Sequence, residues 1–445
     1  MNEIIILGAG ESGVGAALLA KAKNIRVFIS DSGTISSEVK KVLEMNNIPL
    51  EEGKHSEERI LNAAEIIKSP GISENVPIIK KIRQKGIPII SEIEFAGRYS
   101  NALKIGITGS NGKTTTATWI YHILKKAGKD VVLTGNIGTS FARVVSERDP
   151  KIAVIELSSF QLDDMYDFIC DIAVLTNITS DHLDRYENDF QKYTNSKFKI
   201  TQNQRDKDSF IFNLDDQTIK NNLTKLMIKR GYPVSFSVKN SAWIDENKIV
   251  FWFKNKRFEI DFDSLSLKGK HNNYNAMCAG LAALLADVPG EDVIKGLSDF
   301  QGVENRLEFV DKINGVTFIN DSKATNIDSV WYALDSIIEP IIWIAGGTDK
   351  GNDYSSLFDL AKNKVKALIC LGIDNSKLLN SFTGIVPIIK ETKSMEETID
   401  IAFKIAEIGE TVLLSPACAS FDLFKNYEHR GDLFKYFIKK MRFQI

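Results

Sequence analysis

The sequence lacks several features that would place it in a specialised class of protein. No apolar run reaches the roughly 18 residues that a membrane helix needs, and no secretory signal pattern stands at the N-terminus. The formal net charge is only -2, which gives no basic field for nucleic acid. The cysteines form no C-x-x-C pair, so neither a zinc site nor a disulfide framework is predicted; they are Cys170, Cys278, Cys370 and Cys418. We therefore expect a cytoplasmic protein with no nucleic-acid or membrane partner.

The sequence also has no low-complexity tract and no fixed-period repeat. Its 445 residues are too many for one hydrophobic core, so two or three domains are expected. Short apolar runs alternate with helical patterns, which predicts an α/β fold of three domains. We predict a Rossmann-like domain over residues 1–96, a central P-loop-type ATPase sheet over 97–301, and a second Rossmann-like domain over 302–445. Residues 242–262 alternate as strands and predict a small antiparallel sheet within the central domain.

A first glycine loop opens the chain. Gly8, Gly10 and Gly13 form G-x-G-x-x-G after an apolar run, and a second apolar run ends in Asp31. This is the dinucleotide-binding fingerprint, in which glycines let the backbone approach a pyrophosphate and the acid reaches a ribose. Taken alone, the loop favours an NAD-dependent dehydrogenase, but that interpretation explains only about the first ninety residues.

A second glycine loop, "TGSNGKT", spans residues 108–114. Its glycines let backbone N–H groups turn toward one anion, and a helix predicted from about Lys113 adds its positive end. Lys113 can reach the outer phosphates of a nucleotide, and the hydroxyl of Thr114 can bind Mg²⁺. A strict P-loop has glycine where Ile107 stands. A turn that binds nothing is the alternative, and nucleotide triphosphate binding is the preferred prediction.

Polar residues at the ends of predicted strands are candidate metal ligands. Glu156 follows one buried run, and Asp181, His182 and Asp184 follow the next. Both groups are predicted at the carboxyl edge of the central sheet, beside the second glycine loop. Carboxylate oxygens are ligands that Mg²⁺ prefers.

In the third domain, "NDSKATN" (320–326) follows a predicted strand and is almost entirely polar. Its Asp321, Lys323 and Thr325 could contact an ion, a phosphate or a carboxylate, but a capped turn explains the stretch equally well. The stretch "LLSPACASFDLFKNY" (413–427) allows a similar pair of interpretations, with a helix start and core positions for Phe421 and Phe424 as the plainer one.

Seven stretches together resemble the Mur ligases of peptidoglycan precursor synthesis over essentially the whole chain, and most closely those that add D-glutamate to UDP-N-acetylmuramoyl-L-alanine. They are "TGSNGKTT", "LTGNIG", "ELSSFQL", "LTNITSDHLDRY", "HNNYNA", "INDSKATN" and "LLSPACASFDLFKNYEHRG". The resemblance implies that the first glycine loop holds the UDP of a sugar nucleotide and the second holds ATP. It also implies ATP-driven amide formation through an acyl phosphate, with Mg²⁺ as cofactor, in cell wall biogenesis and hence in cell shape and division.

The resemblance assigns roles residue by residue. The sugar nucleotide would be bound by Gly10, Glu11, Ser12, Gly13, Asp31, Ser32 and Asn136. ATP would be bound by Gly109, Ser110, Asn111, Gly112, Lys113, Thr114, Thr115, Asn272, Asn275, Arg306 and Asp321. The metal ligands would be Thr114, Glu156, His182 and a carbamylated Lys197; of these Glu156, His182 and Lys197 would be catalytic together with Lys113. D-Glutamate would be bound by Thr325, Lys323, Lys350, Ser420, Phe421 and Tyr427.

Two positions depart from the expected family pattern. Asp349 precedes Lys350 where glycine is expected, and Tyr427 stands where phenylalanine is also familiar. Within ligases, an L-glutamate-adding muramoyl ligase or a folylpolyglutamate synthetase is the alternative, and "SPACAS" argues against only the latter. A non-catalytic nucleotide-binding regulator is the alternative outside enzymes. We expect a monomer.

Overall fold

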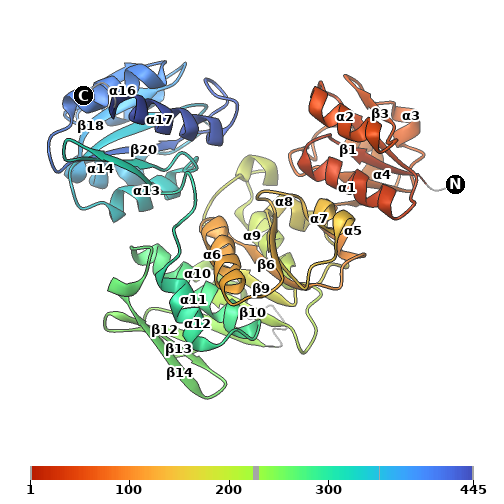
Figure 1. Ribbon diagram of the computed structural model, residues 1–445. Helices are drawn as coiled ribbons and strands as arrows, with labels where there is room; N and C mark the ends of the chain where they lie inside the picture. The colour runs from red at the N-terminus through yellow and green to blue at the C-terminus, as the bar shows by residue number, and fades with distance from the viewer. Residues whose placement is uncertain (1–2, 224–229, 350, 443–445) are drawn as a thin grey trace. The chain divides into compact units, whose positions relative to one another are not determined.

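The computed structural model describes residues 3–223, 230–349 and 351–442. The chain divides into two compact units, Met1–Phe300 and Gln301–Ile445. The first unit holds a five-stranded and a nine-stranded sheet, and the second holds a six-stranded sheet (Figure 1). The predicted α/β class is therefore confirmed, whereas the bounds of the three predicted domains stay a prediction.

The first sheet has the order β3-β2-β1-β4-β5, and each of its pairings is parallel. Every residue of the central strand is buried, as expected for a parallel sheet covered on both faces. The strands are β1 (Ile4–Leu7), β2 (Val27–Asp31), β3 (Leu50–Glu52), β4 (Glu65–Lys68) and β5 (Ile89–Ile90). The helices are α1 (Glu11–Ala22), α2 (Ser37–Met45), α3 (Glu57–Ile60), α4 (Pro77–Gln84) and α5 (Glu92–Gly97).

The central sheet has the order β14-β13-β12-β11-β10-β9-β6-β8-β7. Its strands are β6 (Leu103–Thr108), β7 (Val131–Gly135), β8 (Ile152–Glu156), β9 (Ile172–Leu175), β10 (Ser209–Asn213), β11 (Gly231–Ser235), β12 (Ala242–Asp245), β13 (Lys248–Phe253) and β14 (Lys256–Asp261). Its helices are α6 (Lys113–Lys126), α7 (Phe141–Glu147), α8 (Ser159–Asp163), α9 (Phe190–Phe198), α10 (Gln217–Leu223), α11 (Lys270–Leu285) and α12 (Gly290–Ser298), with short 3₁₀ turns η1 (Leu183–Tyr186), η2 (Lys199–Thr201) and η3 (Phe262–Ser264).

The predicted antiparallel strands exist, but they continue the central sheet. β12 pairs in parallel with β11, whereas β13 and β14 follow as antiparallel neighbours. The tight turns at Glu246 and at Lys254–Asn255, where φ is positive, reverse the chain after β12 and β13. Backbone groups at the edge of β11 would otherwise lack ladder partners, and β12 supplies them.

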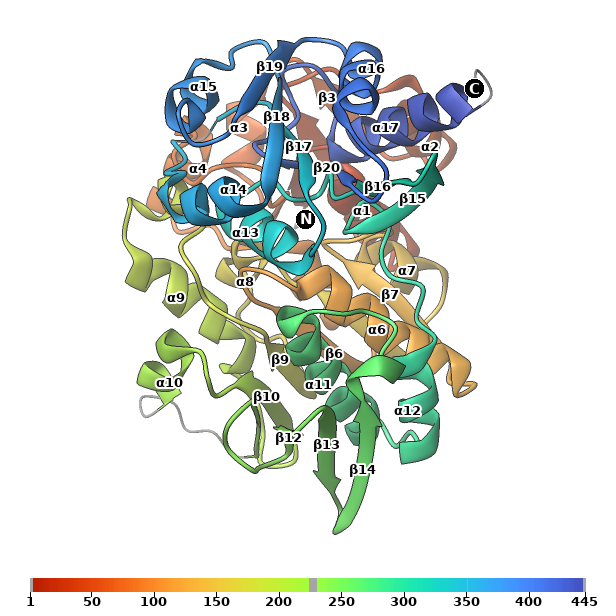
Figure 2. The same cartoon turned by 90° about the vertical axis from the view of Figure 1, so that its left-hand side faces the viewer.

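The third sheet has the order β15-β16-β20-β17-β18-β19, with only β15 antiparallel. Its strands are β15 (Glu308–Ile313), β16 (Val316–Asn320), β17 (Ile341–Gly346), β18 (Val365–Leu371), β19 (Ile388–Thr392) and β20 (Thr411–Ala417). Figure 2 shows α13 (Ile327–Ser336), α14 (Phe358–Lys364) and α15 (Ser376–Phe382) on one side of this sheet and α16 (Met395–Ile405) and α17 (Tyr427–Arg442) on the other; a 3₁₀ turn, η4 (Ser355–Leu357), precedes α14. Each side has its own apolar core. Across the described ranges, no helix is both long and apolar enough to cross a membrane.

Candidate functional site

The second glycine loop connects β6 to the N-terminus of α6. Its two glycines have φ values of 149° at Gly109 and 81° at Gly112, in the region that side chains avoid. A Cβ atom at Gly109 would lie 2.0 Å from the hydroxyl of Thr176, and one at Gly112 would lie 2.4 Å from Oδ1 of Asn275. Neither position therefore tolerates a side chain. Backbone N–H groups and the positive end of a 14-residue helix meet here, which is the arrangement that binds phosphate.

Two lysine side chains converge on one carbonyl of this loop. Lys113 Nζ donates to the carbonyl oxygens of Gly109 at 2.8 Å and Ser110 at 2.7 Å. Lys197 Nζ, on α9, donates to the same Gly109 oxygen at 2.9 Å. The Lys197 side chain is 2% exposed, and burial lowers its pKa well below the ordinary lysine value, with the nearby Lys113 charge adding to the effect.

Glu156 ends β8, the strand beside β6. Its Oε1 atom accepts a hydrogen bond from the amide of Asn136 at 3.2 Å, so the structure brings these two predicted residues together. Its Oε2 atom is buried and has no hydrogen-bond partner among the described residues. An unpartnered buried carboxylate oxygen is costly unless a ligand completes it, and its hard-donor chemistry fits Mg²⁺. Thr114, the other predicted ligand, is buried in the first turn of α6.

His182 lies at the start of η1, in a left-handed backbone conformation with φ of 52°. Its Nε2 atom is 3.6 Å from Asp181 Oδ2, and its ring lies edge-on to Phe160 with centroids 5.3 Å apart. Over the residues that the structure describes, no three His, Cys, Asp or Glu side chains are grouped to hold a metal. The four predicted metal ligands include only two residues of these types, Glu156 and His182; the other two are Thr114 and Lys197.

The asparagines of "HNNYNA" lie against the second glycine loop. Asn275 accepts a hydrogen bond from the hydroxyl of Thr116 at 3.2 Å and donates to Asn272 at 3.1 Å. Both come from the first turns of α11. The structure thus brings residues 270–275 to a loop about 160 positions earlier in the chain.

Two residues that brace the second loop were not found from the sequence. The Asn177 side chain accepts from the backbone N–H of Asn111 at 2.8 Å and donates to its carbonyl at 2.9 Å. The hydroxyl of Tyr193 is 3.0 Å from Ser110 Oγ. Asn177 lies two residues after the end of β9, a signal that could have found it, whereas Tyr193 resembles an ordinary aromatic helix residue in the sequence.

The first glycine loop connects β1 to α1 and is closely packed. A Cβ atom at Gly13 would lie 1.9 Å from the Gly8 carbonyl oxygen. Asp31 Oδ2 accepts from the N–H of Ala9 at 2.7 Å, and its Oδ1 accepts from the N–H of Gly33 at 2.8 Å. Asp31 therefore braces the loop itself.

The other predicted residues of the first loop differ in burial. Gly10, Glu11 and Ser32 are exposed, and Ser12 is partly buried. Glu11 accepts hydrogen bonds from Arg143 at 2.8 Å and from the N–H of Ser140 at 3.1 Å, both from the central domain. Its carboxylate therefore links the first domain to α7.

The second unit gathers the two motifs of the third domain. Asp321 follows β16 and is fully buried; it accepts from Ser415 Oγ at 2.9 Å and lies 3.7 Å from Arg306. Burial raises the pKa of Asp321 to about 6. The Lys323 ammonium lies 5.4 Å from the centre of the Tyr427 ring. "NDSKATN" is therefore packed against the segment 413–427. It also caps a helix, as the plainer interpretation expects, because Asn326 Oδ1 accepts from the N–H of Ser329 at 2.9 Å at the start of α13.

The remaining predicted residues of this unit are placed as follows. Ser420 is 2% exposed and Phe421 is 73% exposed, so the expected core position for Phe421 is wrong. Phe424 is partly buried and packs against the apolar core, and α17 starts at Tyr427, as the plainer interpretation expects. The N–H of Thr325 donates to the Lys323 carbonyl at 3.0 Å. Lys350 lies outside the described residues.

Arg430 joins the two motifs and was not predicted. Its guanidinium is 1% exposed and donates to the Ser322 hydroxyl at 3.0 Å, the Ser322 carbonyl at 2.9 Å and the Cys418 carbonyl at 3.3 Å. Burial lowers its pKa to about 10. A sequence signal existed, since Arg430 shares a buried helix face with Phe434 and Ile438, where an arginine needs a special reason.

Comparison with known proteins supports one family along the chain. Residues 2–91 match "Mur ligase MurD-like, N-terminal domain", residues 107–283 match "Mur ligase middle domain", and residues 305–418 match "Mur ligase, glutamate ligase domain". Two similar curated proteins are the UDP-N-acetylmuramoylalanine--D-glutamate ligases of Bacteroides fragilis and Cytophaga hutchinsonii. The first is 51% identical and covers 99% of this chain and 100% of its own; the second is 51% identical and covers 98% of each.

Solved structures share the fold at low identity. UDP-N-acetylmuramate-alanine ligase MurC from Thermotoga maritima has a TM-score of 0.65 at 17% identity and covers 100% of both chains. MurF ligase from the same organism, solved in complex with ADP, has a TM-score of 0.62 at 14% identity and covers 95% of this chain and 99% of its own. With the profile matches and the full-length relatives, these findings show that the chain belongs to the Mur ligase family.

Proposed function

We propose that the protein catalyses the ATP-dependent addition of D-glutamate to UDP-N-acetylmuramoyl-L-alanine, as a monomer in the cytoplasm, during peptidoglycan precursor synthesis. The observation that carries this proposal is full-length identity of 51% to relatives named for that reaction. The substrate carboxylate attacks the γ-phosphate of ATP, which gives an acyl phosphate and ADP. The amine of D-glutamate then attacks the acyl carbon, an amide forms, and phosphate leaves.

The second glycine loop is the proposed ATP site. Negative charge spreads over the transferring phosphoryl group, so positioning and cationic contacts supply most of the catalysis. Lys113 extends from the first residue of α6 along this loop, and we assign it to the phosphates. Asn272 and Asn275 are assigned to the same nucleotide, as are Arg306 and Asp321 of the second unit.

Mg²⁺ would be held by two sets of ligands. We assign Thr114 and Glu156 to one ion, which the unpartnered Oε2 of Glu156 supports, and His182 and Lys197 to the second. When bound, Mg²⁺ neutralises charge on the phosphate oxygens and so makes the γ-phosphate a better electrophile. The described residues themselves orient the phosphates through backbone N–H groups and the Lys113 ammonium.

We further propose that Lys197 is carbamylated. An ammonium would repel both Lys113 and Mg²⁺, whereas a carbamate carries negative charge and supplies oxygen ligands. The lowered pKa of Lys197 supports this assignment because it favours the neutral amine, the form that adds to CO₂.

The sugar nucleotide is assigned to the first glycine loop and Asn136. D-Glutamate is assigned to residues of two segments of the second unit. They are Lys323 and Thr325 of "NDSKATN" and Ser420, Phe421 and Tyr427 of the segment 413–427, with Lys350 added from the sequence. The close packing of Lys323 and Tyr427 supports one binding region for an amino acid with two carboxylates.

The test is phosphate release from ATP in the presence of UDP-N-acetylmuramoyl-L-alanine, with D-glutamate, L-glutamate or no amino acid added. We expect release only with D-glutamate. Release with L-glutamate instead would keep the chemistry and overturn the substrate. Nucleotide binding without release under any condition would leave a nucleotide-binding regulator.

A further inference from the structure

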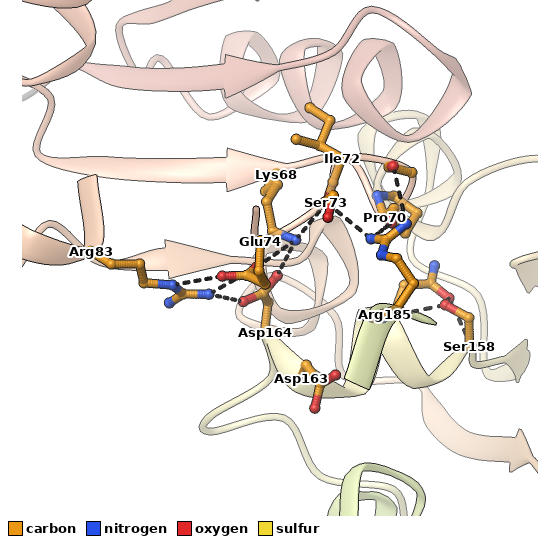
Figure 3. Close-up of polar contacts among 12 residues, drawn as sticks. Lys68, Pro70, Ile72, Ser73, Glu74, Arg83, Ser158, Asp163, Asp164 and Arg185 are labelled. Carbon is orange, nitrogen blue, oxygen red and sulfur yellow. Dashed lines mark hydrogen bonds and ion pairs between the residues drawn. The ribbon is translucent and has the colours of Figure 1, made fainter. Parts of the chain in front are cut away.

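Arg185 of the central domain holds three successive backbone carbonyls of the first domain. Its guanidinium donates to the oxygens of Pro70 at 3.3 Å, Gly71 at 3.4 Å and Ile72 at 3.2 Å (Figure 3). It belongs to η1, three positions after His182. A planar guanidinium with five donors can hold several acceptors in a fixed orientation, which an ammonium cannot do.

Residues 69–72, of which Arg185 holds the last three, form one wall of the first glycine loop. The N–H of Ser69 donates to the Leu7 carbonyl at 3.0 Å, and a Cβ atom at Gly8 would lie 2.6 Å from Ser69 Oγ. The Ser69 hydroxyl is buried and has no hydrogen-bond partner within the described ranges. A shift of this segment would therefore move one side of the first loop directly.

The other face of the Arg185 guanidinium lies on the ring of Phe160, 4.3 Å from its centre. The same ring packs edge-on against His182. Arg185 thus connects a wall of the first glycine loop to the aromatic ring that supports His182. The backbone between Arg185 and His182 is short and fixed, since the N–H of Arg185 donates to the His182 carbonyl at 3.0 Å.

A cluster of ion pairs also joins the first and central domains. Lys68 is 3% exposed and pairs with Asp164 at 3.1 Å and Glu74 at 3.0 Å, while Arg83 pairs with Asp164 at 2.6 Å (Figure 3). This cluster crosses from the first domain to the end of α8. Lys68 Nζ also donates to the Ile72 carbonyl, at 3.2 Å, so the two contacts share one acceptor. Arg185 adds the carbonyls of Pro70 and Gly71, and these two contacts distinguish it from the Lys68 cluster.

We propose that Arg185 is a positioning residue that aligns segment 69–72 with His182, so that the first glycine loop presents the carboxylate end of its bound sugar nucleotide in register with the second loop. This inference rests on the function proposed above. Because Arg185 acts through segment 69–72 and Phe160, its removal should affect the sugar nucleotide more than ATP.

The test compares Arg185→Ala, Arg185→Lys and the matched control Arg83→Ala, which removes an arginine from the same domain junction. In Arg185→Ala we expect kcat to fall about 10-fold and KM for UDP-N-acetylmuramoyl-L-alanine to rise about 10-fold, with KM for ATP within about two-fold of the unmodified value. Arg185→Lys should have kcat and KM values between those of Arg185→Ala and the wild-type protein. Added guanidinium ion at millimolar concentration should partly restore the kcat of Arg185→Ala. Arg83→Ala should stay within about two-fold in all constants.

Thermal unfolding of each variant separates local from global damage, and only folded variants are compared. Equal effects of Arg185→Ala and Arg83→Ala would reduce Arg185 to a domain-attachment contact and overturn the proposal. Unchanged kinetics in Arg185→Ala, or equal changes in KM for all three substrates, would do the same. If the wild-type protein shows no D-glutamate-dependent phosphate release, the proposed function is overturned, and this inference with it.

Discussion

The two glycine loops use one backbone device for different purposes. Each follows a buried parallel strand, turns through a glycine with positive φ (93° at Gly8 and 149° at Gly109), and leads into a helix longer than ten residues. In both loops, neighbouring atoms leave no space for a Cβ atom at those glycines. The backbone alone therefore makes two anion-binding turns.

The side chains make the difference between them. At the first loop the carboxylates of Asp31 and Glu11 are engaged with N–H groups and Arg143, and no lysine is bound to the loop's own carbonyls among the described contacts. At the second loop Lys113 and Lys197 both donate to the Gly109 carbonyl. A loop with few cationic contacts suits a diphosphate that is bound but does not react. A loop that carries the Lys113 ammonium suits a phosphate group whose charge changes during reaction.

The strongest test of this difference between the loops removes the Lys113 ammonium from the second loop. Lys113→Ala should lower kcat for phosphate release about 10³-fold, because the transferring phosphoryl group loses a direct charge contact. Lys125→Ala, an exposed lysine in the last turn of the same helix, is the matched control and should be neutral. Steady-state phosphate release measures both. Retained activity in Lys113→Ala would make the two loops equivalent.

The second lysine should matter for a different reason. Lys197→Ala should lose about 10²-fold in kcat, and a small added carboxylate such as acetate should restore part of it by replacing the carbamate. Because burial disfavours the charged amine, Lys197→Met should keep or raise the unfolding midpoint while remaining inactive. Mass measurement of the intact protein under CO₂ reports the modification directly. Full activity in Lys197→Ala would remove this residue from the mechanism.

The first loop should be sensitive to added side-chain volume, because its glycines are closely packed, and less sensitive to a change of charge. Gly13→Ala forces a Cβ atom against the Gly8 carbonyl oxygen, so we expect about 3 kcal/mol of destabilisation and a raised KM for the sugar nucleotide. Gly10→Ala is the control for stability, since no atom lies within 4 Å of the Cβ it would add. Urea unfolding and substrate titration measure the two effects. Equal stability of both variants would contradict the close packing of this loop.

A smaller effect concerns the buried carboxyl group of Glu92, which makes the stability of the protein depend on pH. Glu92 is fully buried on α5, and burial raises its pKa to about 8, with the charge of Glu11 adding to the rise. The folded protein thus keeps a proton that the unfolded chain loses, so stability is greatest below about pH 4.5 and falls as pH rises to about 8. Glu92→Gln should flatten this slope and stabilise the protein by about 2 kcal/mol near pH 8, less near pH 5.

Urea midpoints across that pH range measure the Glu92 effect. Glu147→Gln, at the exposed end of α7, serves as the matched control and should leave the slope unchanged. Parallel pH profiles for Glu92→Gln and the unmodified protein would show that Glu92 is ionised in the fold.

Much of the fold could be predicted because its signals are local. The strand ahead of each glycine loop and the helix from Lys113 follow from patterns a few residues long. The strands β3, β7, β11, β15 and β19 were not predicted, since they are short or partly exposed and their pairing depends on neighbours far along the chain. The continuation of the central sheet through β12 was missed for the same reason.

The candidate site divides in a similar way. By itself, the sequence determined which backbone turns could bind anions and which motifs carry charge, because glycine spacing and strand–helix alternation act over a few residues. Only the tertiary structure decided that Lys197 lies on Gly109, that Arg430 joins the motifs of the third domain, and that Arg185 grips segment 69–72. Each of these contacts joins residues 80 or more positions apart. Such pairs depend on how buried sheets and helices pack, and no local pattern encodes them.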